Sequence, residues 1–338
     1  MMDKHTDFFK YIDNFAKIAH VVSVPVKNPE MESPLVTIAI PTYKRADLLK
    51  EAIDSALNQD CDDTYEVLVI DNNPERDDET ERLMHSYSGY ANISYYKNAE
   101  NVGMFGNWNR MLTLAQGKWV VMLHDDDMLK PFFLKTIVPL LNDDCGVIAC
   151  RYHKLNEGVL SKGKRWKKQV EKMAFIDFAW GDCIGAPVGV VMHKEKAISI
   201  GGFNEVFYPA SDYHFFANMT LKHSTLMVND YLSIYRMECN ASIKIETLNG
   251  FMRMNYMFSR AIWQKCNFPQ WLWHSVELCR IRKQIKSLRR NWNKGYDCTE
   301  IPYSKNLFLY WCSYYIMYTL VYKNYVRISK WLKRNYYV

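Results

Sequence analysis

The chain lacks the cysteine spacing of a zinc site or a disulfide framework, because its nine cysteines are odd in number and include no CxxC pair. Scattered thiols of this kind are typical of reduced cysteines in the cytosol. Residues 1–20 have no long apolar run and contain Asp3, Asp7 and Asp13, so they lack the pattern of a signal peptide. No nucleic-acid-binding motif accompanies the net charge of +6. We therefore expect a cytoplasmic protein that has no nucleic-acid partner.

The composition is that of an ordinary globular protein, with 49% hydrophobic and 24% charged residues in a chain of 338. Apolar residues recur at helical spacing near the start and three prolines follow, so residues 1–34 predict an amphipathic helix and a linker. Residues 35–240 predict an α/β domain. Residues 241–338 predict a helical region that is basic and aromatic.

The α/β prediction rests on short apolar runs that alternate with helical segments. Such runs are typical of a mostly parallel sheet that is covered by helices on both faces. No internal repeat is visible. The strands are expected at 35–40, 65–70, 93–96, 118–123 and 146–151, and the helices at 46–59, 79–87, 105–115 and 132–141.

Three consecutive carboxylates follow one of these strands, in the sequence His124-Asp125-Asp126-Asp127. Like charges at this density are costly to hold together unless a cation neutralises them. Mg²⁺ and Mn²⁺ prefer carboxylate and phosphate oxygens and usually lie between a protein and a phosphorylated ligand. The cluster therefore indicates a divalent metal site, and the alternative is a solvated acidic turn.

Two other strand ends and one loop carry polar residues. Residues 41–45 follow the first strand and residues 71–74 follow the second. Ligands bind beyond the carboxyl ends of parallel strands, so these residues are expected to converge on one crevice and to contact a nucleobase. Residues 101–107 contain two glycines at the start of a predicted helix, whose N-terminus attracts anionic groups. Taken alone, residues 71–74 have the alternative of a plain turn, and residues 101–107 have that of a loop with a helix cap.

In their order and spacing these segments resemble the family 2 glycosyltransferases with the GT-A fold, in particular those of bacterial O-antigen and capsule assembly. The resemblance covers about residues 35–236. Gly201-Gly202-Phe203-Asn204-Glu205 and Ser211-Asp212-Tyr213 continue it, since they resemble the family's glycine-phenylalanine turn and acidic base motif. The fold that it implies is a Rossmann-like, mostly parallel sheet flanked by helices.

The resemblance also implies a role for each matching residue. Asp127 and Asp125 are implied as ligands of Mn²⁺ or Mg²⁺, and His124 is expected to pack beside them rather than to bind the ion. Asp212 is implied as the general base. Contacts to the nucleotide sugar are implied for Pro41, Thr42, Tyr43, Arg45, Asp71, Asn72, Asn101, Gly103, Asn107, Asp125 and Asp126.

The residues themselves support a base at position 212, because a carboxylate at a helix start among aromatic residues can be desolvated and its pKa tuned. The alternatives are an acidic residue that complements the helix dipole, and His214 as the base. Acceptor contacts are expected from Trp180, Asp182, His214 and Arg236. Trp180 suits stacking on a sugar face, and its alternative is core packing.

The resemblance thus implies an inverting, metal-dependent glycosyltransferase that uses a nucleoside-diphosphate sugar, with a UDP-sugar favoured. Its acceptor would be a hydroxyl of a glycan or of a polyprenyl-diphosphate-linked oligosaccharide. One alternative is a non-catalytic nucleotide-sugar-binding or scaffold protein. A nucleotidyltransferase of related fold is the other, but it usually has a glycine-rich phosphate loop after the first strand, and residues 41–45 contain no glycine.

The C-terminal region predicts helices over 251–262 and 272–288, and an apolar, tyrosine-rich segment over 307–322. That segment is shorter than the about 20 apolar residues that span a bilayer. Aromatic residues next to Lys and Arg suit a membrane interface, so we expect a peripheral protein on the cytosolic face of the inner membrane. The alternatives are a helical cap on the catalytic domain and a homodimer contact.

Overall fold

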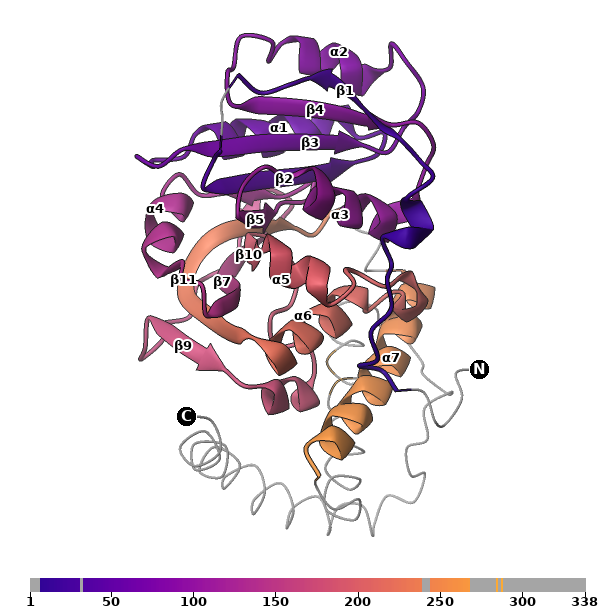
Figure 1. Ribbon diagram of the computed structural model, residues 1–338. Helices are drawn as coiled ribbons and strands as arrows, with labels where there is room; N and C mark the ends of the chain where they lie inside the picture. Colours follow the sequence, from indigo (N-terminus) through magenta and orange to yellow (C-terminus); the bar gives the residue numbers. More distant parts are fainter. Residues whose placement is uncertain (1–6, 31–32, 239–243, 268–283, 285–286, 288–338) are drawn as a thin grey trace.

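The computed structural model describes residues 7–30, 33–238 and 244–267, together with Gln284 and Ser287 (Figure 1). The helix predicted over 272–288, apart from those two residues, and the aromatic segment 307–322 lie outside the described part. Among the described residues, none of the helices combines the length and the apolar character that crossing a membrane requires.

The strands of the described residues form one sheet with the order β1-β4-β3-β2-β5-β10-β7-β11-β6, while β8 pairs with β7 and β9 with β11. Strands β4, β3, β2 and β5 are parallel, β10 is antiparallel to both of its neighbours, and β7 is parallel to β11. The strands are β1 Ser23–Lys27, β2 Val36–Thr42, β3 Tyr65–Asp71, β4 Ile93–Asn98, β5 Trp119–Met122, β6 Met128–Leu129, β7 Cys145–Asn156, β8 Val159–Leu160, β9 Val170–Met173, β10 Val190–His193 and β11 Ser224–Arg236.

Helices cover both faces of this sheet (Figure 1). Helices α1, α2 and α4 contribute to one core cluster, and α3, α5, α6 and α7 contribute to the other. The α-helices are α1 Ala46–Leu57, α2 Glu79–His85, α3 Gly103–Leu114, α4 Phe133–Ile137, α5 Lys194–Ser199, α6 Ser211–Lys222 and α7 Ile245–Lys265. The 3-10 helices are η1 Ala16–Ile18, η2 Val138–Leu140, η3 Phe175–Trp180 and η4 Glu205–Phe207.

The apolar runs of the central strands explain this two-sided burial. Successive side chains of a strand point to opposite faces, and in β2 Ile38 and Ile40 join one cluster while Ala39 joins the other. All seven residues of β2 are buried. The sheet was therefore correctly predicted from continuous apolar runs, and each predicted strand and helix between residues 35 and 151 is found with its ends shifted by a few residues.

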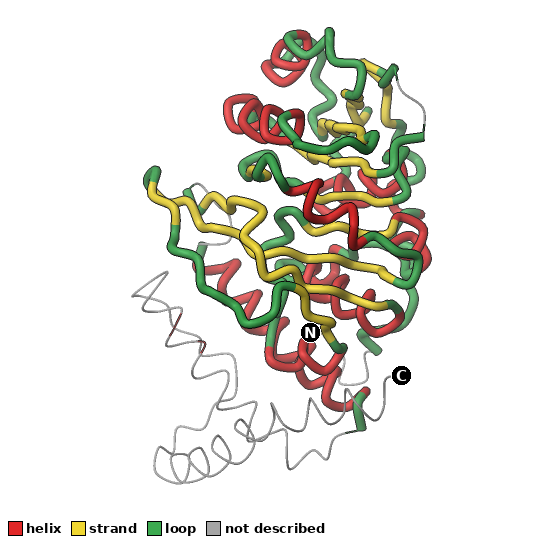
Figure 2. The backbone as a smooth tube through the Cα atoms, turned by 90° about the vertical axis from the view of Figure 1, so that its left-hand side faces the viewer, coloured by secondary structure: helices red, strands yellow, loops and turns green. Residues whose placement is uncertain are grey.

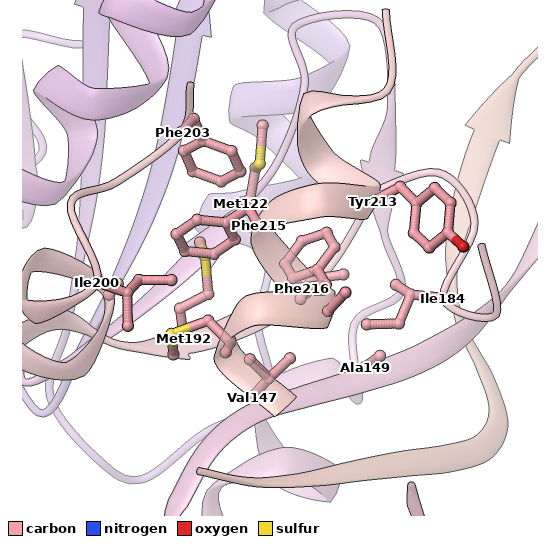
Figure 3. Packing of buried hydrophobic residues seen from close by; sticks show 14 of the residues in the cluster. Met122, Val147, Ala149, Ile184, Met192, Ile200, Phe203, Tyr213, Phe215 and Phe216 are labelled. Atoms are coloured by element: carbon pink, nitrogen blue, oxygen red, sulfur yellow. The ribbon is translucent and has the colours of Figure 1, made fainter. Parts of the chain in front are cut away.

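Helix α6 is held on the sheet by a tightly packed aromatic group (Figure 3). The rings of Phe203 and Phe215 stack with their centroids 4.0 Å apart, and the ring of Phe216 lies edge-on to that of Phe215. Met122 and Met192 of the sheet belong to the same cluster. Because α6 is fixed in this way, its first turn, which carries Asp212, has a defined position at the edge of the sheet.

The amphipathic helix predicted near the N-terminus is not found in the described residues from 7 onward. Apart from the single turn η1, residues 7–22 have no helix, and β1 lies in the predicted linker and pairs antiparallel with β4. The physical reason is that Phe8 and Phe9 insert separately among aromatic side chains of η3, α6 and α7 instead of sharing one helical face.

The beginning of the C-terminal region is part of the same core as the α/β domain. Helix α7 packs against η3, and its Phe258 and Ile262 are fully or almost fully buried in the cluster that also contains α6. Helix α7 therefore forms a helical cap on the α/β domain, which is one of the alternatives given for this region. The predicted boundary at residue 240 falls in residues 239–243, which lie outside the described part.

Candidate functional site

A cavity of about 590 Å³ lies at the carboxyl ends of β2, β3 and β5 and extends to the first turns of α6 and α7. The parallel strands bring distant parts of the sequence to this edge, as expected for residues that follow such strands. Of the predicted site residues, the cavity is lined by Pro41, Thr42, Tyr43, Arg45, Asn72, Asn101, Asn107, Asp125, Asp126, Asp182 and Asp212.

The acidic turn follows β5 and is held from the side of β2. Thr42 Oγ1 donates a 2.8 Å hydrogen bond to Asp125, and Arg45 Nη1 lies 3.3 Å from Asp125 and 3.0 Å from Asp126. Burial nevertheless raises the pKa of Asp125 and that of Asp127. Burial of carboxylates in this way disfavours their charged form unless a cation lies nearby.

Arg236 braces the same turn from β11 instead of facing the cavity. Its backbone N–H donates to Asp127 Oδ1 at 2.9 Å, and its Nε donates to the Asp126 carbonyl at 3.0 Å. Its Nη2 pairs with Glu51 of α1 at 2.7 Å. Because these contacts direct the guanidinium to the turn and to α1, Arg236 does not line the cavity, contrary to the predicted acceptor contact.

The residues of this turn fit a divalent cation. His124, Asp126 and Asp127 offer ligand atoms that all lie within 4.8 Å of one another. Asp127 Oδ2 and His124 Nε2 are buried and have no hydrogen-bond partner among the described residues. Unsatisfied buried ligand atoms beside further carboxylates are the donor set that an ion would complete.

Of the two predicted ligands, this group contains Asp127 but not Asp125, and it adds His124 and Asp126. His124 stacks on Trp108 at 5.3 Å, as predicted, but its Nδ1 also lies 3.4 Å from Asp127 Oδ2. Burial alone would lower the pKa of His124, but the neighbouring carboxylates, Asp127 foremost, raise it. Asp125 is bonded by Thr42 and Arg45 and is not a member of this compact group, whereas His124 is.

Asp71 was predicted to face the base, but it lies beneath the cavity. Its carboxylate is fully buried, pairs with Lys97 Nζ at 2.8 Å and accepts from the Tyr95 hydroxyl at 3.0 Å. Burial raises the pKa of Asp71, and the Lys97 ammonium opposes that shift. A carboxylate engaged in this way supports the strand ends and does not line the cavity.

A network of asparagines forms the wall above Asp71. Asn72 donates to Asn101 Oδ1 at 2.8 Å, and its own Oδ1 accepts from Asn98 at 3.0 Å. Asn98 also donates to Asn107 at 3.0 Å. Lys97 and Asn98 were not predicted as site residues from the sequence, although both directly follow the strand predicted over 93–96.

Gly103 has φ +74° and allows the chain to turn into α3. Its N–H donates to Asn101 Oδ1 at 2.8 Å, and its carbonyl accepts from Asn72 at 3.2 Å. Gly103 itself does not line the cavity, whereas Met104 and Trp108 of the same helix do. Its contribution is therefore to orient its neighbours.

Asp212 and Asp182 approach the cavity from the side opposite to β2. Asp212 Oδ1 accepts from the Tyr213 N–H at 2.8 Å, and Asp182 Oδ1 accepts from the Ile184 and Gly185 N–H groups at 3.1 and 3.0 Å. Burial raises the pKa of Asp212 to about 6. Burial, followed by the nearby charge of Asp212, also raises the pKa of Asp182. Asp212 is thus suited to exchange a proton near neutral pH.

His214 and Trp180 lie in the core and do not line the cavity. His214 Nε2 lies within hydrogen-bond distance of the Phe8 carbonyl, its ring is 4.0 Å from that of Phe207, and burial lowers its pKa to about 4. Two residues along a helix turn through about 200°, so His214 points away from Asp212. The ring of Trp180 lies edge-on to that of Trp263, with the ring centres 5.6 Å apart. This is core packing, the alternative to stacking on a sugar face.

The far side of the cavity was not anticipated from the sequence. It combines residues of β7, of β11, of the turn before α6 and of α7, which are distant in the chain. Their only local signal is the Tyr208-Pro209 turn just before the predicted base. These lining residues are Tyr152, Lys154, Tyr208, Pro209, Tyr235, Thr247, Leu248 and Phe251.

Known proteins with similar sequences include glycosyltransferases. A GalNAc(5)-diNAcBac-PP-undecaprenol beta-1,3-glucosyltransferase of Campylobacter jejuni is 30% identical over 207 residues, which are 60% of this chain and 65% of that protein. An uncharacterised glycosyltransferase of Methanocaldococcus jannaschii is 32% identical over 103 residues, which are 30% of this chain and 35% of that protein. The chain therefore spans less than two thirds of the length of either relative.

Solved structures share the fold at low sequence identity. Staphylococcus aureus TarS 1–349, in complex with UDP-GlcNAc, has a TM-score of 0.55 and 15% identity over 78% of this chain and 74% of that chain. The mannosyltransferase PcManGT of Pyrobaculum calidifontis, in complex with GDP-Man and Mn²⁺, has a TM-score of 0.52 and 17% identity over 79% and 78%. The fold is thus of the predicted GT-A type.

The sequence match to a family places the chain more specifically. The family model described as glycosyl transferase family 2 matches residues 37–237. This range contains the acidic turn, the asparagine network and Asp212. Because the match covers more than half of the 338 residues, the chain belongs to glycosyl transferase family 2.

Proposed function

We propose that this protein is an inverting, metal-dependent glycosyltransferase that transfers a sugar from a nucleoside-diphosphate sugar to a hydroxyl group. The observation that carries the proposal is that one cavity contains both the acidic turn at Asp125 and Asp126 and a recessed carboxylate at Asp212. The first fits the diphosphate end of a donor, and the second fits a base that acts on an acceptor.

The donor half of the cavity is formed by the ends of β2 and β3. Thr42, Asn72 and Asn107 offer hydroxyl and amide groups that suit the base and ribose, and Arg45 offers a cation that suits a phosphate. A divalent cation held by His124, Asp126 and Asp127 would neutralise the charge of the leaving diphosphate.

Asp212 is the proposed general base. It takes the proton from the acceptor hydroxyl while that oxygen bonds to the anomeric carbon, and the bond from that carbon to the diphosphate oxygen breaks. The electron pair leaves with the nucleoside diphosphate. A single displacement of this kind inverts the anomeric configuration.

The substrates follow from chemistry and from the relatives. The TarS and PcManGT structures hold UDP-GlcNAc and GDP-Man, and a UDP-sugar is the donor that we favour here. The name of the Campylobacter relative describes a polyprenyl-diphosphate-linked acceptor. A glycan or a lipid-linked oligosaccharide at the cytosolic face of the membrane is the acceptor class that we propose.

The test compares Asp212→Asn with the parent and with Asp143→Asn, an exposed carboxylate outside the cavity. A panel of UDP, GDP, CDP and TDP sugars with and without Mn²⁺ first identifies the donor by thermal shift. Asp212→Asn should keep that shift but lose about 10²- to 10⁴-fold in the release of nucleoside diphosphate.

Near-normal turnover by Asp212→Asn would overturn the assignment of the base. Donor binding without turnover by the parent, over a range of glycan acceptors, would favour the alternative of a non-catalytic nucleotide-sugar-binding protein. Transfer with retention of configuration, detected by NMR of the product, would contradict the single displacement.

A further inference from the structure

One surface segment holds as much excess positive charge as the whole chain. Residues 151–173, which we call the basic flap, contain eight Lys and Arg residues and two Glu residues, a net charge of +6. The full chain of 338 residues also has a net charge of +6, so the rest is neutral in sum. The cations are Arg151, Lys154, Lys162, Lys164, Arg165, Lys167, Lys168 and Lys172.

The backbone of the flap is fixed, although most of its cationic side chains are exposed. Ser161 pairs with Lys154 through hydrogen bonds of 2.8 Å in both directions. The Lys164 N–H donates to the Tyr231 hydroxyl at 2.7 Å, and the Lys168 carbonyl accepts from Asn229 at 2.8 Å. Strand β9 then pairs with β11 at the margin of the molecule (Figure 1).

An aromatic ring orders two of these cations. The guanidinium of Arg151 lies 4.3 Å and the ammonium of Lys164 4.4 Å from the centre of the Trp166 ring. Cations at this distance are attracted to the face of the ring, which favours ordered positions of both side chains. The flap therefore presents its charges on an ordered base. It contains the end of the long strand β7 and the short strand β8 that pairs with it (Figure 2).

The tip of the flap is apolar. Strand β8, which follows the turn at Glu157 and Gly158, consists of Val159 and Leu160, whose exposed fractions are 69% and 46%. Two exposed aliphatic side chains next to Lys162 and Lys164 form an amphipathic edge. Cations attract phosphate head groups, and aliphatic side chains at the same edge enter the acyl boundary below them.

We propose that the basic flap docks on an anionic lipid bilayer. A polyanion in water, such as a nucleic acid, would match the cations but would leave the aliphatic tip exposed. The flap also borders the cavity, because Tyr152 and Lys154 line it from β7 while Arg151 and His153 contact Trp166 and Tyr231. This surface deepens the proposed function by giving the place where a lipid-linked acceptor is met, but docking requires no catalysis.

The experiment is sedimentation of the full-length chain with vesicles, in the absence of any donor. Phosphatidylcholine vesicles are compared with vesicles that contain one quarter phosphatidylglycerol, at 0.1 M and 0.5 M NaCl. One variant changes Lys162, Lys164, Arg165, Lys167 and Lys168 to Gln, and a second is Val159→Ser with Leu160→Ser. A matched control changes five exposed lysines elsewhere to Gln, at Lys10, Lys17, Lys50, Lys118 and Lys135.

We expect the parent and the matched control to bind the anionic vesicles and to be released by 0.5 M NaCl. The five-cation variant should bind at least about tenfold more weakly, since each Lys or Arg near such a surface adds to the attraction. The tip variant should bind about threefold to tenfold more weakly, because two aliphatic side chains no longer enter the acyl boundary. Unchanged thermal unfolding shows that each variant is folded.

Binding of the five-cation variant at the level of the parent would overturn the proposal, as would a parent that binds neither type of vesicle. Strong binding of the parent to poly(U) but not to vesicles would show that the flap serves a soluble polyanion instead. Since no donor is present, failure here leaves the transferase assignment intact, and an inactive Asp212→Asn variant that still binds vesicles leaves the docking surface intact.

Discussion

Asp212 is a carboxylate whose surroundings set its proton affinity. Burial raises its pKa to about 6, while the Tyr213 N–H and the charge of His124 oppose that shift. A general base must be deprotonated to act, so activity should rise with pH through about 6 and fall about tenfold for each unit below it. The measurement is kcat/KM for nucleoside-diphosphate release between pH 4.5 and 8.5.

A profile that stays flat down to pH 4.5 would contradict this expectation, because it would place the essential pKa at the ordinary value of an aspartate. His214 provides the matched control. It lies in the core with a pKa lowered to about 4, so His214→Gln should leave the position of the acidic limb unchanged even where it affects stability.

The proposed metal ligands can be distinguished residue by residue. The compact group contains His124, Asp126 and Asp127, whereas Asp125 is bonded by Thr42 and Arg45. His124→Phe keeps a ring to stack on Trp108 but removes the imidazole nitrogens. We expect this change to weaken Mn²⁺ binding in the presence of UDP about tenfold or more, measured by the electron paramagnetic resonance of free Mn²⁺.

Asp127→Ala should weaken Mn²⁺ binding further, since it removes a buried oxygen that has no hydrogen-bond partner among the described residues. The opposite pattern, with full Mn²⁺ affinity in His124→Phe and a large loss in Asp125→Asn, would return the ligand role to Asp125, as first predicted from the family resemblance.

At the scale of elements, the turn before η4 depends on a glycine. Gly202 has φ +72°, and a Cβ there would lie 2.4 Å from Asn109 Oδ1. That oxygen accepts from the Phe203 N–H at 2.7 Å, and Asn109 Nδ2 donates to the Phe203 carbonyl at 2.9 Å. An alanine at position 202 would therefore have a strained backbone, and its Cβ would clash with the side chain of Asn109, which is held by two hydrogen bonds.

Gly202→Ala should lower the free energy of unfolding by about 2 kcal/mol or more, measured by urea denaturation. Gly158→Ala is the matched control, because Gly158 has φ +73° but no heavy atom within 4 Å of a Cβ. Gly158→Ala should lower the free energy of unfolding only by the backbone strain, about 1 kcal/mol. Equal losses in the two variants would show that the contact with Asn109 contributes nothing.

The N-terminal segment shows how an element can be misjudged. Its aromatic residues recur at helical spacing, but Asp13 accepts from the Phe15 and Ala16 N–H groups, and Asn14 donates to the Gly201 carbonyl at 2.9 Å. Spacing alone cannot distinguish one apolar helical face from side chains that occupy separate pockets, because that choice depends on residues almost 200 positions away.

At the scale of the whole molecule, α7 joins the C-terminal region to the cavity. Leu248 and Phe251 of its first turns line the cavity together with Tyr208, which is 55% exposed. Aromatic rings suit the apolar faces of sugars. We expect Phe251→Ala to raise the KM for a glycan acceptor about threefold to tenfold and to leave hydrolysis of the donor by water unchanged.

Phe132→Ala, at an exposed phenylalanine outside the cavity, is the control for this prediction. An equal effect of Phe251→Ala on donor hydrolysis and on transfer would indicate that the ring supports the fold of the cavity instead of the acceptor. Transfer and hydrolysis are separated by measuring nucleoside-diphosphate release with and without the acceptor.

The order of strands and helices and the edge of the sheet that carries the site were determined by the sequence. Two-sided burial imposes continuous apolar runs on β2, β3 and β5, and chain order in a parallel sheet brings the residues after those runs together. For this reason Thr42, Asn72 and Asp125 could be assigned to one crevice before any coordinate was known.

The partner of each polar group was decided only by the tertiary structure. Asp71 and Asn72 are adjacent in a turn-like sequence, yet one pairs with Lys97 below the cavity and the other lines it. Arg236 braces the acidic turn, and α7 closes the cavity from a region that had looked separate. The physical reason is that burial and charge pairing depend on contacts between distant segments, which local spacing does not encode.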